Sequence, residues 1–451
     1  MAFSTARRDD AQAARTAVRS IETSASWITA SVVLFVFTFS YGAPLVAVVS
    51  LKEIAGEFEN ARSIPALAHS LAWLGSGTGA LAFSWIAERA GIRVTVFFGA
   101  AMIGAGLALA SQAGPWQLLV GHGVFLGLLG GGAINVPLII YISRWFDRRR
   151  GSAIALVSSG QYVAGALWPP IIALGIAHIG WRATMLAFGL ASALAVALAT
   201  LVFLRPTPPP ALAAQGVGVA AASVSGLSRR TTFALLCLAG FLCCTPMAMP
   251  PAHLVALCSD LGIAPARGAL MLSVLLGTAL ISRQFWGWLS DTIGGLYTVL
   301  AASTCQAVAI IGFILTQDEA GLFAVAAAFG LGFSGIIPAY VLVLRELFPV
   351  EQAAWRIPLW FFCNIVGMAL GGWLAGYIYD QVGAYGPAFI IGVALNIANI
   401  SIIGLLAVRQ TPTGWVSHTQ AHKMRVETAP RGAPAVTNTW SSVSSGRSGT
   451  P

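Results

Sequence analysis

Charged side chains are scarce in this sequence. Asp, Glu, Lys and Arg make up 9% of its 451 residues, and 57% are hydrophobic, whereas a soluble protein carries about 25% charged residues. This composition excludes an ordinary soluble domain and indicates a chain that crosses a lipid bilayer many times. In such a chain the net charge of +9 does not predict a nucleic-acid partner. The distribution of the basic residues among the loops instead indicates which loops lie inside the cell.

The motifs of enzymes and metalloproteins are also missing. The sequence contains no phosphate-binding loop, no His-Glu-x-x-His, no Gly-x-Ser-x-Gly and no pair of acids within an apolar run. Its six cysteines have neither zinc-ligand spacing nor a disulfide framework, so we interpret them as packing residues. We therefore expect no enzymatic activity, no cofactor and no metal site.

What the sequence does contain is a series of apolar runs, each near the about 20 residues that a transmembrane helix needs. We identify twelve, near 27–49, 65–86, 94–113, 116–142, 152–176, 182–204, 232–255, 264–288, 296–316, 320–344, 354–379 and 385–408. They predict an all-α polytopic membrane protein with two six-helix halves. The predicted domains are a cytoplasmic N-terminal segment (1–26), the first half (27–204), a cytoplasmic linker (205–231), the second half (232–408) and a disordered cytoplasmic tail (409–451).

The distribution of basic residues predicts the orientation. With the N-terminus placed inside, 20 of the 25 Lys and Arg residues fall in segments on the cytoplasmic side, and four fall in outside loops: Lys52, Arg62, Arg182 and Arg267. Cytoplasmic loops carry the excess of positive charge in membrane proteins. We therefore expect both termini in the cytoplasm and location in the inner (plasma) membrane.

The two halves repeat one another. Residues 84–91 (SWIAERAG) align with residues 287–294 (GWLSDTIG), and Gly127 and Gly132 align with Gly330 and Gly335 at the same offset. Similar halves joined by a long middle loop predict a substrate path between them, near the middle of the bilayer.

The duplicated stretch resembles a loop motif of the major facilitator superfamily, Gly-x-x-x-Asp-Arg-x-Gly-Arg-Arg. The first copy is filled by Ser84, Glu88, Arg89, Gly91 and Arg93, and the second keeps Gly287, Asp291 and Gly294. The resemblance implies a twelve-helix transporter in which these residues control conformation. An acid here can complement the positive N-terminal end of a neighbouring helix.

We accordingly expect Glu88 near the start of the eleventh span and Asp291 near the start of the fifth, where Arg148, Arg149 and Arg150 offer a second partner. The alternative is a turn whose charges serve topology alone.

Two further stretches resemble the monocarboxylate transporters and the oxalate/formate exchangers within that superfamily. They are residues 144–153 (RWFDRRRGSA), followed by Ser159 and Gly160, and Arg283 with residues 285–291 (FWGWLSD). The exchangers carry a lysine in the eleventh span, whereas residues 360–367 of this chain contain none, and Asn364 lies near the expected place. Animal-type monocarboxylate transporters carry an aspartate four residues before the arginine, where this chain has Ala279. The first difference argues against a small dianion, and the second against proton coupling through that pair.

Arg283 is the main candidate for substrate binding. It lies eight positions before Asp291, which is roughly 12 Å along a helix, so it falls inside the hydrocarbon region if Asp291 marks the water boundary. A guanidinium there is costly and is rarely kept without a function. An anion that binds and leaves is the simplest function, since no acid falls inside the predicted spans. The alternative is a structural arginine that reaches the cytoplasmic face or bonds helix carbonyls.

Other polar residues in the apolar runs are weaker candidates for substrate contact: Tyr41, Asn135, Gln161, Tyr162, Tyr340 and Asn364. Each can equally bond a neighbouring helix. His69, His122 and His253 can titrate near neutral pH, but packing histidines are commoner.

These observations together predict a secondary active transporter that moves a small organic anion, with a monocarboxylate favoured, by alternating access. We expect it to act as a monomer in the lipid bilayer. The alternative within transport is an exporter of drugs or neutral metabolites with a structural Arg283. A membrane enzyme and a non-transporting sensor are the rivals from other classes.

Overall fold

The computed structural model describes residues 22–112, 114–204 and 226–410, which form one compact unit. Within these ranges the chain is helical and contains no β-strand, as the apolar runs predicted. The linker 205–231 and the segments 1–26 and 409–451 lie largely outside the described residues. We use N-terminal half for residues 22–204 and C-terminal half for residues 226–410.

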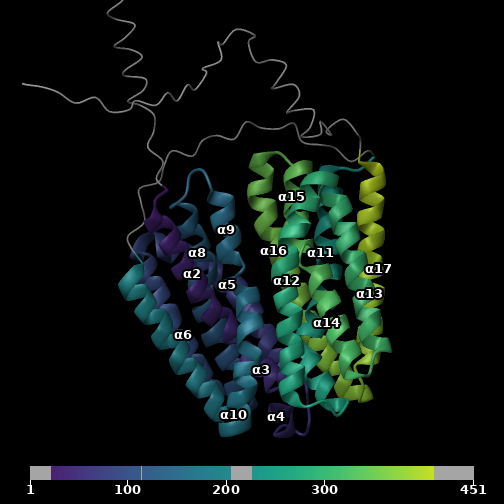
Figure 1. Ribbon diagram of the computed structural model, residues 1–451. Helices are drawn as coiled ribbons and strands as arrows, with labels where there is room; N and C mark the ends of the chain where they lie inside the picture. The colour runs from purple at the N-terminus through teal and green to yellow at the C-terminus, as the bar shows by residue number, and fades with distance from the viewer. Residues whose placement is uncertain (1–21, 113, 205–225, 411–451) are drawn as a thin grey trace, which may run out of the picture. The chain divides into compact units, whose positions relative to one another are not determined.

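The helices of the N-terminal half are α2 (Ser24–Gly42), α3 (Leu45–Val49), α4 (Leu51–Gly56), α5 (Ser63–Ala90), α6 (Ile92–Ala110), α7 (Pro115–Val120), η1 (Gly121–Gly131), α8 (Gly132–Ser143), α9 (Arg150–Ser158) and α10 (Gly160–Phe203). Those of the C-terminal half are α11 (Arg229–Asp260), α12 (Pro265–Ile293), α13 (Gly295–Leu315), α14 (Glu319–Phe333), α15 (Ile336–Leu347), α16 (Val350–Val382) and α17 (Gly386–Arg409). Figure 1 shows the purple-to-blue helices of the first half beside the green-to-yellow helices of the second.

Ten helical segments in the described residues are long and apolar enough to cross a membrane. One of them, Arg150–Phe203, holds two spans, because Gly180 breaks α10 with a positive φ of 78° that favours glycine. Helix α5 is long enough but falls outside the ten, since His, Ser, Thr and Gly lower its apolar character. With α5 added and Arg150–Phe203 counted twice, the segments correspond to the twelve predicted spans.

Buried apolar side chains form two clusters that nearly follow the halves. One draws almost wholly on residues 30–204, and the other on residues 233–407 with a few members from the first half, including Tyr162. Between the halves, α5 packs on α16 and α10 packs on α12. The α5 and α16 pair approaches closely at Gly376, where a Cβ atom would lie 3.0 Å from the Arg62 carbonyl oxygen. Such small residues let helix backbones come together in a membrane protein.

The two ends of the bundle carry different parts of the chain. Helix α2 begins, α10 ends, α11 begins and α17 ends at one end, which we call the terminal end (Figure 1). The opposite end, which we call the distal end, holds α4 and the turns that follow α11 and α16. The four basic residues predicted to lie outside are all in distal segments.

Candidate functional site

Arg283 lies where the two halves meet. It is carried by α12 of the C-terminal half and is partly buried. Its guanidinium carbon lies 5.4 Å from the ring centroid of Tyr162, which belongs to α10 of the N-terminal half. The charge of Arg283 also acts on the phenol of Tyr41 in α2. Three of the predicted site residues, from both halves, are thus brought into one region.

Arg283 has no carboxylate partner among the residues that the structure describes. The ion pairs there join other cations to other acids. The Tyr162 ring face attracts a cation through its quadrupole, which supplies part of the stabilisation that an acid would give. Within the described residues, no carboxylate therefore occupies the hydrogen-bond donors of this guanidinium.

Aromatic rings surround this region. The Tyr41 ring lies 5.9 Å from that of Trp73, and the Tyr162 ring lies 6.3 Å from that of Phe333. The Trp73 indole N–H donates to Nε2 of His69 at 3.2 Å, so Nδ1 of His69 carries the proton and donates to the Pro44 carbonyl at 3.3 Å. His69 is thereby held as a neutral imidazole that positions Trp73.

Asn135 serves helix packing in this structure. Its side-chain oxygen accepts from Ser40 at 3.0 Å, and its nitrogen donates to Ser76 at 3.1 Å. These bonds tie α8 to α2 and α5 within one half. Gln161, the next candidate, is partly buried beside Tyr162 on α10.

Tyr340 and Asn364 lie inside the C-terminal half. The Tyr340 hydroxyl is fully buried and donates to Asn399 at 2.6 Å, so the prediction that it contacts substrate does not fit this structure. The Asn364 side chain is 2% exposed, and its polar atoms have no protein partner. It faces Gly240 of α11, where a Cβ atom would approach its oxygen to 2.3 Å. Both side chains therefore point into their own half.

A polar cluster around Tyr340 escaped the sequence analysis. Asn399 donates to Ser303 at 3.0 Å and to Asn396 at 3.1 Å, and Asn396 donates to the Ser303 carbonyl at 3.0 Å. All of these side chains are fully buried. The signal was present in the three-residue spacing of Asn396 and Asn399, which places both amides on one face of α17.

The first copy of the duplicated motif lies at the terminal end and is satisfied within the N-terminal half. Glu88 accepts from Arg144 at 2.7 Å, and the Arg89 guanidinium lies 3.8 Å from the Trp85 ring. Arg93 donates to the Leu204 carbonyl. Gly91 has a positive φ of 88° at the turn into α6. Glu88 therefore pairs within its own half, and its proximity to the start of the eleventh span stays a prediction.

The second copy is less constrained. Gly294 repeats the positive φ of Gly91, at 84°. Gly287 and Asp291 line a shallow pocket with Pro338 and Arg345 of the same half. Within the described residues Asp291 makes no ion pair with the fifth span or its preceding loop. The described polar bonds between the halves lie instead at the distal end.

Arg62 is at the centre of those distal bonds. Burial alone lowers the pKa of its guanidinium, but its hydrogen bonds and charge interactions with Asp260 and Tyr385 outweigh burial and hold the pKa above its ordinary value. Arg62 therefore remains a cation at any physiological pH. From the sequence, Arg62 is predicted only as one of the basic residues outside the cell.

The fold and these features are those of a membrane transporter. The profile of the Major Facilitator Superfamily matches residues 30–252 and 236–447. The chain therefore belongs to the Major Facilitator Superfamily, as the duplicated motif predicted.

Several curated relatives support the narrower branch. Monocarboxylate transporter 13 of Bos taurus is 29% identical over 326 residues, which cover 71% of this chain and 75% of the relative. Monocarboxylate transporter 11 of Homo sapiens is 25% identical over 397 residues, covering 84% and 82%. The uncharacterized MFS-type transporter YcxA of Bacillus subtilis is 24% identical over 367 residues, covering 78% and 87%. The similarity to the first two supports the monocarboxylate transporter branch that residues 144–153 and 283–291 predicted.

Solved structures share the fold. The nucleoside transporter NupG superposes with a TM-score of 0.66 at 12% identity, over 84% of this chain and 99% of that one. A bacterial homolog of the lysosomal transporter Spinster, in an inward-facing and occupied conformation, gives a TM-score of 0.58 at 16% identity over 91% and 99%.

Proposed function

We propose that this transporter moves a small organic anion, a monocarboxylate, and that Arg283 binds its carboxylate. The observation that carries the proposal is a guanidinium at the contact of the two halves, beside Tyr162, with no acid paired to it in the described residues. A guanidinium matches a carboxylate with two parallel hydrogen bonds. The names of the curated relatives point to the same substrate class.

A single fixed cation favours one negative charge on the substrate. The eleventh span lacks the lysine of the oxalate/formate exchangers; Asn364 lies near the expected place, and its amide is buried against Gly240. A second carboxylate would then have no cation to meet. We therefore favour monocarboxylates over small dicarboxylates.

The charge of the site also favours exchange. Ala279, one turn before Arg283, is fully buried and cannot relay a proton. An empty Arg283 site carries a net charge that resists passage through a closed state, whereas a bound carboxylate neutralises it. We infer exchange or facilitated diffusion of the anion, with obligatory exchange as the limit. Concentrative uptake driven by a pH gradient alone, without internal substrate, would contradict this inference.

The distribution of basic residues favours the inner membrane with both termini in the cytoplasm, so that the terminal end faces inward. We also propose that the protein functions as a monomer that opens to each side of the membrane in turn.

Transport into proteoliposomes tests the role of Arg283. Labelled mono- and dicarboxylates are offered with and without internal substrate to the natural protein, to Arg283→Gln and to Arg283→Lys. We expect Arg283→Gln to abolish carboxylate transport while the protein stays inserted and monodisperse. Arg283→Lys keeps the charge but loses the planar fork, so we expect weak and less selective transport.

The matched control is Arg267→Gln, which removes an exposed arginine of the same helix whose partner is Glu319. It should retain transport. Natural rates of carboxylate transport in Arg283→Gln would refute the proposal, and competition by amphiphilic cations in place of carboxylates would favour the drug exporter.

A further inference from the structure

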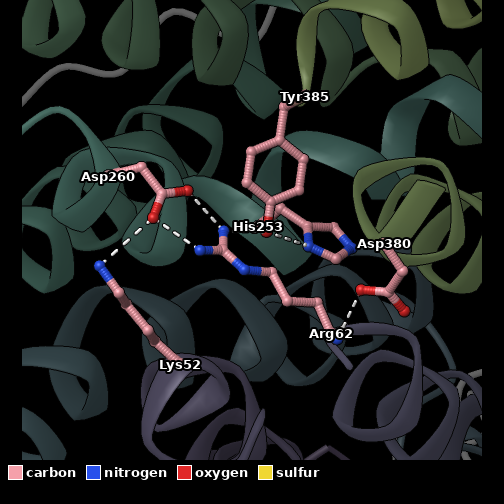
Figure 2. A network of polar contacts seen from close by, with 6 residues as sticks. All are labelled: Lys52, Arg62, His253, Asp260, Asp380 and Tyr385. Carbon is pink, nitrogen blue, oxygen red and sulfur yellow. Dashed lines mark hydrogen bonds and ion pairs between the residues drawn. The ribbon is translucent and has the colours of Figure 1, made fainter. Parts of the chain in front are cut away.

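The polar bonds that join the two halves centre on Arg62, which precedes α5 at the distal end (Figure 2). Its side chain is 6% exposed, and its two terminal nitrogens donate to the two oxygens of Asp260 at 2.5 and 2.6 Å. Asp260 is the last residue of α11 in the other half, and Lys52 approaches it to 3.3 Å. A bidentate pair of this kind fixes geometry as well as charge.

Aromatic rings from the C-terminal half enclose the same guanidinium. Its central carbon lies 3.6 Å from the ring centroid of Tyr379 and 5.3 Å from that of Tyr385. The Tyr385 hydroxyl also accepts a hydrogen bond from Arg62 at 2.9 Å. The cation is thus held on several sides by residues of the other half.

Asp380 makes a second bridge to the same turn. One of its oxygens accepts from the backbone N–H of Arg62 at 2.7 Å (Figure 2). The other accepts from the backbone N–H of Ser63 at 2.9 Å. The first N–H groups of a helix need such acceptors, and a carboxylate there also complements the helix dipole. Helix α5 has no side-chain cap from its own N-cap residue. Its cap is supplied by α16 of the opposite half.

His253 completes the network and fixes its direction. The Gly372 carbonyl can only accept, so Nε2 of His253 donates to it, at 2.7 Å. Nδ1 must then accept from the Tyr385 hydroxyl, at 3.1 Å, which leaves the hydroxyl oxygen to accept from Arg62. Every member is satisfied, which makes the network rigid.

Two other arginine–carboxylate pairs at this end stay within one half. Arg182 donates to both oxygens of Glu57 at 2.7 and 2.5 Å inside the N-terminal half, and Arg267 pairs with Glu319 at 2.5 Å inside the C-terminal half. Their side chains are more exposed than that of Arg62. Separation of the halves at the distal end would leave both pairs intact but would break every bond of Arg62 to its partners.

We propose that Arg62, Asp260 and Asp380 form a latch that holds the distal end closed and that must break each time the transporter opens that end. The latch rests on the alternating access of the proposed function, and it does not depend on the substrate being an anion. Its strength sets the ratio of distal-open to distal-closed protein. Arg62 and its partners are therefore positioning residues that act on the transport cycle without touching the substrate.

Distance measurements between spin labels test the latch in the full-length chain. Labels are placed at Gln112→Cys and Gln317→Cys, exposed positions in distal loops of the two halves, after replacement of the six native cysteines. Asp260→Asn removes the charge that grips Arg62, and Asp380→Ala removes the cap of α5. We expect each change to raise the ratio of long to short distances by roughly tenfold or more, since loss of one partner of a buried charged pair is costly.

Glu57→Gln is the matched control, because it breaks an arginine pair of the same end inside one half, and its distances should stay as in the natural protein. Two results would overturn the latch: unchanged distances in both folded, monodisperse latch variants, or an equal shift in Glu57→Gln. The two variants disrupt different bonds, so failure of one to fold leaves the other as the test. The label distances are measured without substrate. A negative carboxylate transport assay would therefore refute the proposed anion substrate without affecting the test of the latch.

Discussion

At the scale of single residues, burial separates side chains that hold the protein together from those that can meet a substrate. Tyr340 and Tyr41 are both tyrosines in apolar helices. The Tyr340 hydroxyl is bonded to Asn399 in the core of one half, whereas Tyr41 lies within the field of Arg283. A buried acceptor that loses its donor costs more than an exposed one.

Tyr340→Phe should therefore reduce stability and leave substrate affinity unchanged. The substitution removes the donor to Asn399 and should cost about 1–3 kcal/mol of the free energy of unfolding, seen as a lower melting temperature in a thermal scan of purified protein. The half-saturating carboxylate concentration in proteoliposomes should stay as in the natural protein. A large rise in that concentration with no change in melting temperature would return Tyr340 to the binding site.

The sequence could identify Arg283 because a lone cation in an apolar run carries an obvious cost. It could not decide the direction of Tyr340 or Asn135, because a hydroxyl or an amide in a membrane helix bonds a neighbouring helix as readily as a substrate. The sequence could show Arg62 only as a loop charge, since its partners Asp260 and Asp380 lie 198 and 318 residues further along the chain. Contacts of such long range follow from the packing of the halves and leave no local pattern.

At the scale of elements, the pair of α5 and α16 is the contact on which distal closure depends. Gly372 lies against Ser70, and Gly376 lies against the Arg62 carbonyl, one turn from Asp380. The absence of side chains at these glycines lets the carboxylate of Asp380 reach the start of α5. The twelve apolar runs predicted the helices, but they could not predict that α5 packs on α16. The sequence has many glycines, and each of them allows close packing against several different helices.

Gly376→Ala should weaken distal closure through backbone separation alone. The new Cβ atom would lie 3.0 Å from the Arg62 carbonyl oxygen, closer than ordinary contact, so the backbone at the start of α5 must give way slightly. We expect the same shift toward long label distances as in Asp380→Ala, by a smaller factor. Gly56→Ala is the control at the same end, because nothing lies within 4 Å of its Cβ position. Equal distances in the two variants would show that the close approach has no part in closure.

At the scale of the whole molecule, charge is divided between the two ends. Lys52, Arg62, Arg182 and Arg267 all lie in distal segments and are all paired with acids. Among the described residues, the turns at the terminal end hold Arg89, Arg93, Arg144, Arg148, Arg149 and Arg150. Paired distal cations leave the terminal end with the excess of positive charge, which is the pattern of an inward-facing side.

Topology is therefore open to a direct test in cells. Reporter fusions placed after Arg409 should be active only if the reporter works in the cytoplasm, and a cysteine at Gln317 in a variant without native cysteines should react with a membrane-impermeant maleimide added outside. Gly151→Cys in the same background, at the start of α9 with open space around it, should react only after the membrane is opened. Reaction of Gly151→Cys from outside would invert the orientation.

The cap of α5 by Asp380 also bears on how the protein is made. The ribosome must add 318 residues after Arg62 before it reaches Asp380, whose carboxylate caps the start of α5. Through this interval the nascent α5 enters the bilayer with water as the acceptor for its leading amide groups. A product truncated before Asp380 would therefore lack the carboxylate that accepts from the first amide groups of α5.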